Sequence, residues 1–544
     1  MADARRRALL QGGLAGALAA LAPATALAAL AAPVIANTAA DDPHTPSGVV
    51  RTRSGRVRGF VDRGMQVFRG IPYGADTAPR RFQPPARELP WRGVRDATRF
   101  GAACPQRGAK DAGSEDCLVL NVTTPALGDG ARLPVLVYIH GGAYTTGSGS
   151  DPLYDGVALC TRGDVVVVTL NHRLGCLGYL YLGELGALGD PTYADAGNAG
   201  QLDLIAALQW VREHAAAFGG DPGNVTVFGQ SGGGAKIATL MAMPAARGLF
   251  HRAWTMSGQQ VTAAGPRAAA RRSALFLDAL GTRDPRRAAT LPVAALLAAA
   301  AVRDPSPVED MALYFGPVLD ARSLPRHPFH PDAPPQSADI PMVIGNTHDE
   351  TRGFLGRDPA MQALDWRSLP AALRAQQYVD LPVDQVIATY RSLYPDYSAA
   401  QVFFAATTAG RSWRGAVLEA EARARQGAPT WAYQLDFPSP LEGGRLGAPH
   451  MIDIPLVFGT LDVPGALSGD SVAAQRVSEA LSGALLAFAR SGDPNHAGLP
   501  AWAQYSLAGR ETMLVDDPPT LARDPRGGER RLYEQAPFVQ RGTF

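Results

Sequence analysis

The stretch Val225-Thr-Val-Phe-Gly-Gln-Ser231-Gly-Gly-Gly234 joins an apolar, β-branched run to a glycine-rich turn and a helix-permissive segment. Residues 225–230 are typical of a buried strand, and residues 235–243 contain mostly helix formers. A strand-to-helix turn with the pattern Gly-x-Ser-x-Gly strains the central residue and exposes its hydroxyl. Ser231 is therefore a candidate nucleophile. The alternative is an ordinary turn, because glycine makes up 59 of the 544 residues.

Other apolar, β-branched runs recur along the chain and alternate with helical patterns. The predicted strands are residues 133–140, 165–170, 225–230, 340–346 and 430–435, and the clearest helical patterns are 202–218 and 477–489. Short apolar strands separated by helices indicate a mostly parallel sheet covered on both faces. Residues 49–68 alternate in polarity instead, which favours an antiparallel edge. The predicted fold class is α/β.

The predicted domain organisation is a single catalytic domain over residues 41–544 with two helical insertions. Residues 262–338 and 356–428 are rich in alanine, arginine and proline and lack strong strand patterns, so we expect them to form helical cap segments. The net charge of +1 arises from 51 basic and 50 acidic residues that are spread along the chain, which gives no sign of nucleic-acid binding.

Residues 1–40 resemble an export signal rather than part of the fold. Arg5-Arg6-Arg7 precedes an uncharged alanine- and leucine-rich run with small-residue cleavage options, and Arg6-Arg7 also fits a twin-arginine pattern. The alternative is a retained membrane anchor, which Pro23 and the glycine content make less favourable. We therefore expect a periplasmic or extracellular protein with no stable membrane insertion after the signal is removed.

The chain has four cysteines. Cys104 and Cys117 bracket a short polar loop that a disulfide could close. Cys160 and Cys176 are separated by a predicted strand of roughly 23 Å, which is too long for bonded cysteines. We expect Cys160 and Cys176 to be free, buried thiols.

A serine nucleophile needs a base and a carboxylate that orients it, and on α/β folds of this kind the order along the chain is serine, acid, histidine. Thr347-His-Asp-Glu350 follows a predicted strand, where open sheets carry their active sites. Two histidines remain beyond it, His450 and His496. His496 lies in a turn without evident constraint, so we choose His450 as the base.

Acyl transfer also needs hydrogen-bond donors for the developing oxyanion. The segment His140-Gly-Gly-Ala-Tyr144 follows a predicted strand and is small enough for its N–H groups to approach a substrate, together with the N–H of Gly232. We expect His140 itself to be structural. The sequence has no HExxH, CxxC or GxxxxGK[ST] motif, and neither Lys110 nor Lys236 follows a serine at SxxK spacing, so zinc-peptidase, redox, P-loop and serine–lysine chemistries lack their residues.

Several motifs together resemble the type-B carboxylesterase family, which includes the cholinesterases, over nearly all of residues 46–510. They are Phe68-Arg-Gly-Ile-Pro-Tyr73, Glu115-Asp-Cys-Leu-Val-Leu-Asn-Val122, Asn171-His-Arg-Leu-Gly175, Phe218-Gly-Gly-Asp-Pro222 and Gly229-Gln-Ser-Gly-Gly233. The resemblance implies an α/β-hydrolase fold. It also implies a serine esterase that forms an acyl-enzyme on small ester substrates and needs no cofactor or metal.

By this resemblance, each site position has an expected role. Ser231 is the nucleophile, Glu350 the acid, His450 the base, Gly142, Ala143 and Gly232 the oxyanion donors, Ser257 a supporting serine, and Cys104 and Cys117 a disulfide. An amide or carbamate hydrolase with the same triad is an alternative. A non-catalytic binding module is a remote alternative, because such relatives typically lack part of the triad.

The chain also departs from the family's pattern at positions that bear on the substrate. Gln230 stands where cholinesterases carry glutamate, and the loop between Cys104 and Cys117 has no aromatic residue to hold a quaternary ammonium. Choline esters are therefore not expected as substrates. Gly232 replaces the usual alanine, and Ala143 replaces glycine in a loop whose open form is associated with bulky alcohol groups.

Overall fold

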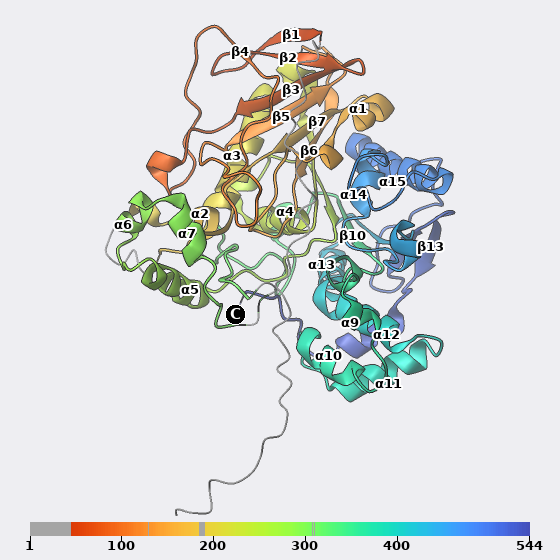
Figure 1. The fold of residues 1–544 in the computed structure, drawn as a ribbon. Helices are drawn as coiled ribbons and strands as arrows, with labels where there is room; N and C mark the ends of the chain where they lie inside the picture. The colour runs from red at the N-terminus through yellow and green to blue at the C-terminus, as the bar shows by residue number, and fades with distance from the viewer. Residues whose placement is uncertain (1–44, 129, 184–190, 307, 309–310, 544) are drawn as a thin grey trace, which may run out of the picture.

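A computed structural model describes residues 45–128, 130–183, 191–306, 308 and 311–543 (Figure 1). Within them one sheet of 13 strands runs through the molecule. Across the sheet the strands are β1 (Pro46–Arg51), β2 (Arg56–Asp62), β3 (Met65–Pro72), β5 (Val119–Thr124), β7 (Val166–Leu170), β6 (Leu133–Ile139), β8 (Gly220–Gln230), β9 (Arg252–Met256), β10 (Met342–Thr347), β11 (Thr430–Leu435), β12 (Glu511–Val515) and β13 (Thr520–Arg523), with β4 (Val94–Asp96) beside β2. The predicted export signal lies outside the described residues.

The strand directions explain the sequence patterns. All neighbours from β7 to β12 are parallel, whereas β1, β2, β3, β5 and β7 pair antiparallel, as β12 and β13 do. Every residue of β7 is buried, because a parallel strand with helices on both faces meets no water. The sheet therefore confirms the predicted α/β fold with its antiparallel N-terminal edge.

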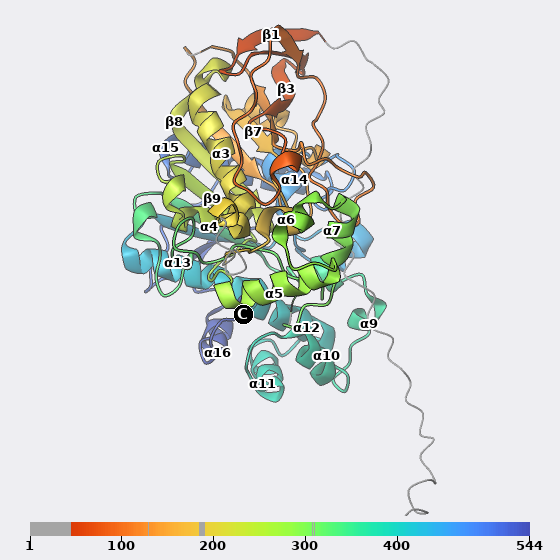
Figure 2. The same cartoon turned by 90° about the vertical axis from the view of Figure 1, so that its left-hand side faces the viewer.

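Two apolar cores cover the two faces of the sheet. Along β6, Val135 and Val137 enter the core shared with α3 (Ala199–His214) and α4 (Gly232–Ala242), whereas Leu136 and Tyr138 enter the core shared with α14 (Asp453–Phe458) and α15 (Val472–Ser491). Successive side chains of a strand point to opposite faces, so one apolar run supplies both cores. Figure 2 shows α3 in front of the sheet, with α15 behind it.

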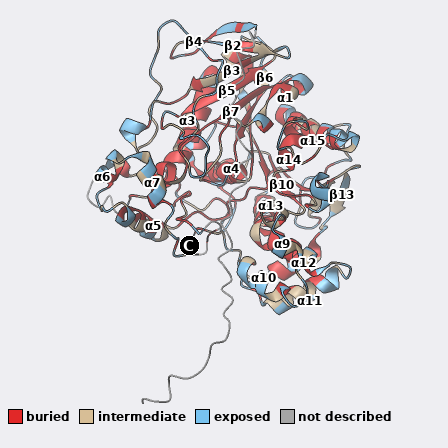
Figure 3. Ribbon diagram, viewed as in Figure 1, coloured by how far each residue is buried: buried red, intermediate tan, exposed pale blue. Residues whose placement is uncertain are grey.

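The remaining helices form smaller groups around this sheet. They are α1 (Val157–Gly163), α2 (Gly175–Tyr179), α5 (Pro266–Ala279), α6 (Pro285–Thr290), α7 (Val293–Ala299), α8 (Arg352–Leu355), α9 (Pro359–Gln362), α10 (Leu369–Gln376), α11 (Val383–Leu393), α12 (Ala399–Thr408), α13 (Arg414–Gln426) and α16 (Gly527–Tyr533). Helices α5 to α7 lie within the first stretch expected to be helical, and α9 to α13 lie within the second. Figure 3 shows exposed residues along α10 and α11, whereas most residues of α12 and α13 are buried.

The boundaries differ from the predictions where local patterns are weak. Strand β8 begins at Gly220, five residues before the predicted run, and β9 was not predicted. The predicted helix 202–218 divides into α3 and a 3-10 turn, Ala215–Phe218. No helix among the described residues is long and apolar enough to cross a membrane.

The structure corrects the predicted disulfide. Cys104 and Cys117 lie side by side as buried, free thiols rather than a covalent pair. Their hydrogen bond, together with burial, raises the pKa of Cys117 well above its usual value, and the Leu174 N–H donates to Cys104 Sγ at 3.3 Å. These contacts satisfy the sulfur atoms without a covalent bond. Cys160 and Cys176 are free and buried as predicted, and burial raises the pKa of each to about 12.

Candidate active site

Ser231 stands on the sharp turn between β8 and α4. Its backbone has φ 57° and ψ −127°, a strained conformation for a residue with a side chain, and its N–H donates to the Met256 carbonyl at 2.7 Å. Both glycines of the Gly-x-Ser-x-Gly pattern are sterically required. A Cβ atom at Gly229 or Gly233 would lie 2.7 Å or 1.9 Å from the Ile139 carbonyl oxygen. The turn therefore closes against the end of β6 only without those side chains.

Glu350 and His450 meet although one hundred positions separate them. Glu350 Oε2 lies 2.5 Å from His450 Nδ1, while Glu350 Oε1 accepts from the Thr347 N–H at 2.8 Å and from Asn346 Nδ2 at 3.1 Å. Burial alone would raise the pKa of Glu350, but the imidazole, the Ser257 hydroxyl and the Thr347 N–H outweigh it and hold that pKa below its usual value. The carboxylate is thus ionised and aimed at the histidine.

The neighbouring Asp349 has a different role. Its N–H donates to the Ala448 carbonyl at 2.9 Å, and its Oδ2 accepts from the Ala448 N–H at 3.1 Å, so the acid loop and the histidine loop are joined as an isolated β-bridge. The other oxygen of Asp349 pairs with Arg352 at 3.1 Å. Asp349 therefore ties two loops together, whereas Glu350 faces His450.

The imidazole of His450 also lies beside the nucleophile turn. Gln230 Nε2, one residue before Ser231, is 3.3 Å from His450 Nε2. Among the described residues, Ser231 Oγ makes no hydrogen bond, as is frequent in free enzymes whose catalytic contacts tighten on binding. The rejected alternative, His496, instead contacts the Ala480 carbonyl on α15 at 2.9 Å.

The loop after β6 brings the expected oxyanion donors toward the serine. Gly142 and Ala143 have φ 81° and 49°, and their N–H groups donate to no acceptor among the described residues. Gly232 packs so closely against this loop that a Cβ on it would lie 2.2 Å from the Ala143 carbonyl oxygen. A developing oxyanion needs unpaired backbone donors close to the nucleophile, which is the role expected of these residues.

Two buried histidines support this loop from the sheet side. His140 stacks on His172 with ring centroids 4.7 Å apart, and its Nδ1 contacts the Gly141 carbonyl at 2.9 Å. Burial and the nearby Lys236 lower the pKa of His140 to about 3, so the ring stays neutral. The ring of His140 is thus buried and neutral against His172, and its structural role stays a prediction.

Three buried ionisable residues beside the site were not predicted. Lys236 lies on α4, Asp453 begins α14, and Glu419 lies on α13 with Oε1 accepting from the Gln260 N–H at 2.8 Å. Burial raises the pKa of both Asp453 and Glu419 to about 8 and lowers that of Lys236 to about 7. For Lys236 and Asp453 the usable signal was a charged residue inside an otherwise apolar helical run, whereas Glu419 lies on a helix with several other charged residues and gives no such signal.

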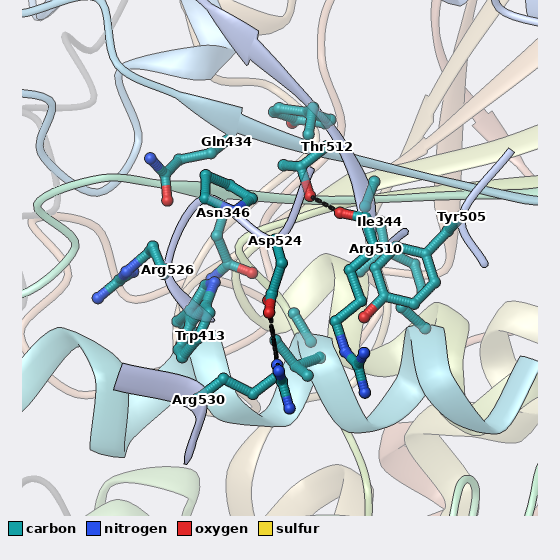
Figure 4. A pocket seen from close by; sticks show the side chains of 16 residues that line it. Ile344, Asn346, Trp413, Gln434, Tyr505, Arg510, Thr512, Asp524, Arg526 and Arg530 are labelled. Carbon is teal, nitrogen blue, oxygen red and sulfur yellow. Dashed lines mark hydrogen bonds and ion pairs between the residues drawn. The ribbon is translucent and has the colours of Figure 1, made fainter. Parts of the chain in front are cut away.

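A pocket lies behind the acid, between α13 and strands β10 to β12 (Figure 4). Asn346, which donates to Glu350, lines it, and Arg530 pairs with Asp524 at 2.7 Å within it. Arg526 is likewise paired with Glu529. None of the predicted site residues lines this pocket, and its charged groups already have partners, so we do not assign it to the substrate.

The sequence and the fold of this chain match those of known proteins. The Carboxylesterase family matches residues 46–532. The para-nitrobenzyl esterase of Bacillus subtilis (strain 168) is 37% identical over 89% of this chain and 98% of its own, and the phenmedipham hydrolase of Pseudarthrobacter oxydans is 34% identical over 88% and 96%. The crystal structure of Geobacillus stearothermophilus carboxylesterase Est55 superposes with a TM-score of 0.79, at 38% identity over 90% of this chain and 100% of that one.

Proposed function

Because this chain belongs to the carboxylesterase family and is a carboxylic ester hydrolase, we propose that Ser231, Glu350 and His450 are its catalytic triad. The observation that carries the proposal is the 2.5 Å contact between Glu350 and His450 beside a strained serine. An ionised, buried carboxylate fixes the tautomer of the imidazole and stabilises the cation that forms during catalysis.

The proposed reaction proceeds through an acyl-enzyme. Ser231 Oγ attacks the ester carbonyl carbon while His450 accepts its proton, and the carbonyl oxygen becomes an oxyanion near the N–H groups of Gly142, Ala143 and Gly232. Collapse breaks the bond to the alcohol, which leaves with the proton from His450. Water then attacks the acyl-enzyme with His450 as base, which releases the acid and restores the serine.

The test combines a variant with covalent labelling. Ser231→Ala should reduce p-nitrophenyl acetate hydrolysis by roughly 10⁴-fold or more, because no other side chain replaces the nucleophile. A fluorophosphonate should label the wild-type peptide that contains residue 231 and leave Ser231→Ala unlabelled, as peptide mass spectrometry can show. Ser491→Ala, an exposed helix-end position, is the matched control and should keep full activity. An active Ser231→Ala variant, or label on another residue, contradicts the triad.

Carbamate hydrolysis is a second candidate, favoured by the phenmedipham hydrolase that is 34% identical to this chain. A panel of p-nitrophenyl esters, matched anilides and phenmedipham on purified protein separates the bond types. We expect esters to have the highest kcat/KM, because the alcohol is a better leaving group than an amine. We expect no turnover of choline esters, since the loop between Cys104 and Cys117 carries Arg107 and Lys110 in place of an aromatic residue.

We also propose that the protein is exported. The support is the arginine-rich start and the alanine-rich run of residues 1–40. N-terminal sequencing of the extracellular or periplasmic protein should find a mature chain that begins within or just after this run. Replacing Arg6 and Arg7 by lysine should leave the precursor in the cytoplasm if the twin-arginine pattern is used. An uncleaved, cytoplasmic wild-type protein contradicts export.

A further inference from the structure

Lys236 is a fully buried lysine directly beneath the proposed oxyanion loop. It is one of only two lysines in the chain, and it lies on α4, five residues after Ser231. Its exposed fraction is 0%, whereas Lys110, the other lysine, is exposed. A buried ammonium is costly unless its surroundings compensate the charge.

The partners of Lys236 are backbone dipoles. Its Nζ donates to the carbonyl oxygens of Ala143 at 2.7 Å and His140 at 3.1 Å, and it lies 5.5 Å from the ring centroid of Tyr144. Across the described residues, no carboxylate lies within ion-pair distance of it. The positive charge is therefore balanced only by carbonyl oxygens and an aromatic face.

The two carbonyls mark the ends of the loop that carries the donors. Between them lie the peptide units whose N–H groups belong to Gly142 and Ala143. Both residues have left-handed backbone, which an alanine adopts only when its surroundings enforce it. On the other side of the loop, the Gly142 carbonyl accepts from the N–H groups of Thr145 and Thr146 at 3.1 Å and 3.0 Å. Lys236 and this turn together hold the loop from two directions.

We propose that Lys236 is a positioning residue of the oxyanion hole: its ammonium holds the carbonyls of His140 and Ala143, and its charge favours the negative oxygen of the transition state. The proposal rests on the triad and oxyanion hole proposed above. The Ala143 oxygen that Lys236 binds lies directly against Gly232, the third donor, so the cation is close to all three donors. In a site closed to water such a charge acts more strongly than in solvent.

The decisive variant is Lys236→Met, which keeps an unbranched side chain one atom shorter than lysine but removes its donors and charge. We expect kcat for p-nitrophenyl acetate to fall by about 100-fold with KM changed by less than about 3-fold. The affinity for an acyl trifluoromethyl ketone, whose serine adduct carries an anionic oxygen, should fall by a similar factor. Lys236→Arg, which keeps the charge, should recover part of both losses. Arg212→Met, which removes a positive charge from an exposed position on α3, is the control and should match the wild type.

The pH profile keeps the proposal testable if Lys236→Met does not fold. Burial lowers the pKa of Lys236 to about 7, so its positive form predominates below that pH and is lost above it. The wild-type kcat/KM should therefore decline on the alkaline side, and Lys236→Arg should lack this decline. A wild-type profile that is flat to pH 9, or a folded Lys236→Met with kcat within about 3-fold of wild type, overturns the proposal. If Ser231→Ala is also active, the triad fails; if only Lys236→Met is active, the triad stands and this inference fails.

Discussion

The two sides of the proposed site differ in how buried charge is balanced. The acid–base side contains Glu350 and His450, and the oxyanion side contains Gly142, Ala143 and Gly232. On the acid–base side, Glu350 is ionised because His450 faces it, while Asp453 nearby has its pKa raised to about 8 by burial and by Glu350, and so keeps its proton at neutral pH. On the oxyanion side, the partners of Lys236 are two carbonyl oxygens and the ring face of Tyr144, and the neutral His140 adds no charge.

This difference follows from the stage of the proposed reaction at which the opposite charge forms beside Glu350 and beside Lys236. In the proposed mechanism the partner of Glu350 is His450, which becomes cationic when it accepts the serine proton, so the pair strengthens during the reaction. The proposed partner of the oxyanion side is the substrate oxygen, which becomes negative only as the transition state forms. Because no carboxylate among the described residues pairs with Lys236, no fixed negative group competes with the substrate oxygen for the backbone N–H donors.

The largest expected effect comes from breaking the acid–base side alone. Glu350→Gln keeps the shape but removes the charge that stabilises the imidazolium, so kcat should fall by about a thousand-fold or more. Asp349→Asn is the matched control, because it alters the neighbouring carboxylate that joins the two loops, and its activity should stay within about ten-fold of wild type. Steady-state kinetics of both variants decide the matter, and the reverse ranking would mean that Asp349 is the catalytic acid.

A smaller effect is expected on the oxyanion side, where the loop at Ala143 should decide which alcohol groups the enzyme accepts. If alanine at position 143 keeps the loop open, tert-butyl acetate should be hydrolysed with a kcat/KM within roughly a hundred-fold of n-butyl acetate. Acid release measured by pH-stat on the two esters tests this, with Ser231→Ala as the background. Turnover of n-butyl acetate with none of tert-butyl acetate would show that Ala143 does not confer tolerance of bulky alcohols.

The smallest effect concerns Asp453, which is neutral near pH 7. Asn resembles the protonated acid, so Asp453→Asn should change kcat at pH 7 by less than about 3-fold. Because the folded pKa of about 8 exceeds the usual 3.8, the wild type binds an extra proton when folded, and its free energy of unfolding falls as pH rises from about 4 to about 8.

In the Asp453→Asn variant, residue 453 does not titrate, so folding takes up no extra proton there. The variant's free energy of unfolding relative to wild type should therefore rise between pH 5 and pH 8 and level off above that range, as urea unfolding at several pH values can measure. Asp470→Asn, at an exposed position, should run parallel to wild type over the same range. A relative stability of Asp453→Asn that does not vary with pH would mean that Asp453 is ionised in the folded protein.

The local sequence pattern was sufficient to predict the central strands and the turn that carries Ser231. The five predicted strands correspond to β6, β7, β8, β10 and β11, because apolar β-branched runs fit a parallel sheet covered on both faces. Strand β9 was missed, since Arg252 and Thr255 interrupt its apolar character. Strand β12, which lies between β11 and β13, contains only two buried residues, so its sequence has little apolar pattern.

The site residues were harder to predict from local sequence patterns because the site depends on contacts between distant segments. The acid and the base lie one hundred residues apart, and only the order of residues along the chain and the family resemblance connected them. The predicted disulfide failed for a related reason: spacing and resemblance brought Cys104 and Cys117 together correctly, but neither specifies whether the sulfur atoms are bonded. Lys236 was set aside for want of a serine–lysine motif, although a lysine inside an apolar helix indicates a compensated buried charge.

The interlock between Gly232 and Ala143 has a consequence for protein engineering. Restoring the family's alanine at position 232 would force its methyl group into the oxyanion loop, so grafting that consensus residue alone should damage the enzyme. A chimera would have to import position 232 and the loop around position 143 as one cassette. We therefore expect positions 232 and 143 to be epistatic, so that a library should vary them together.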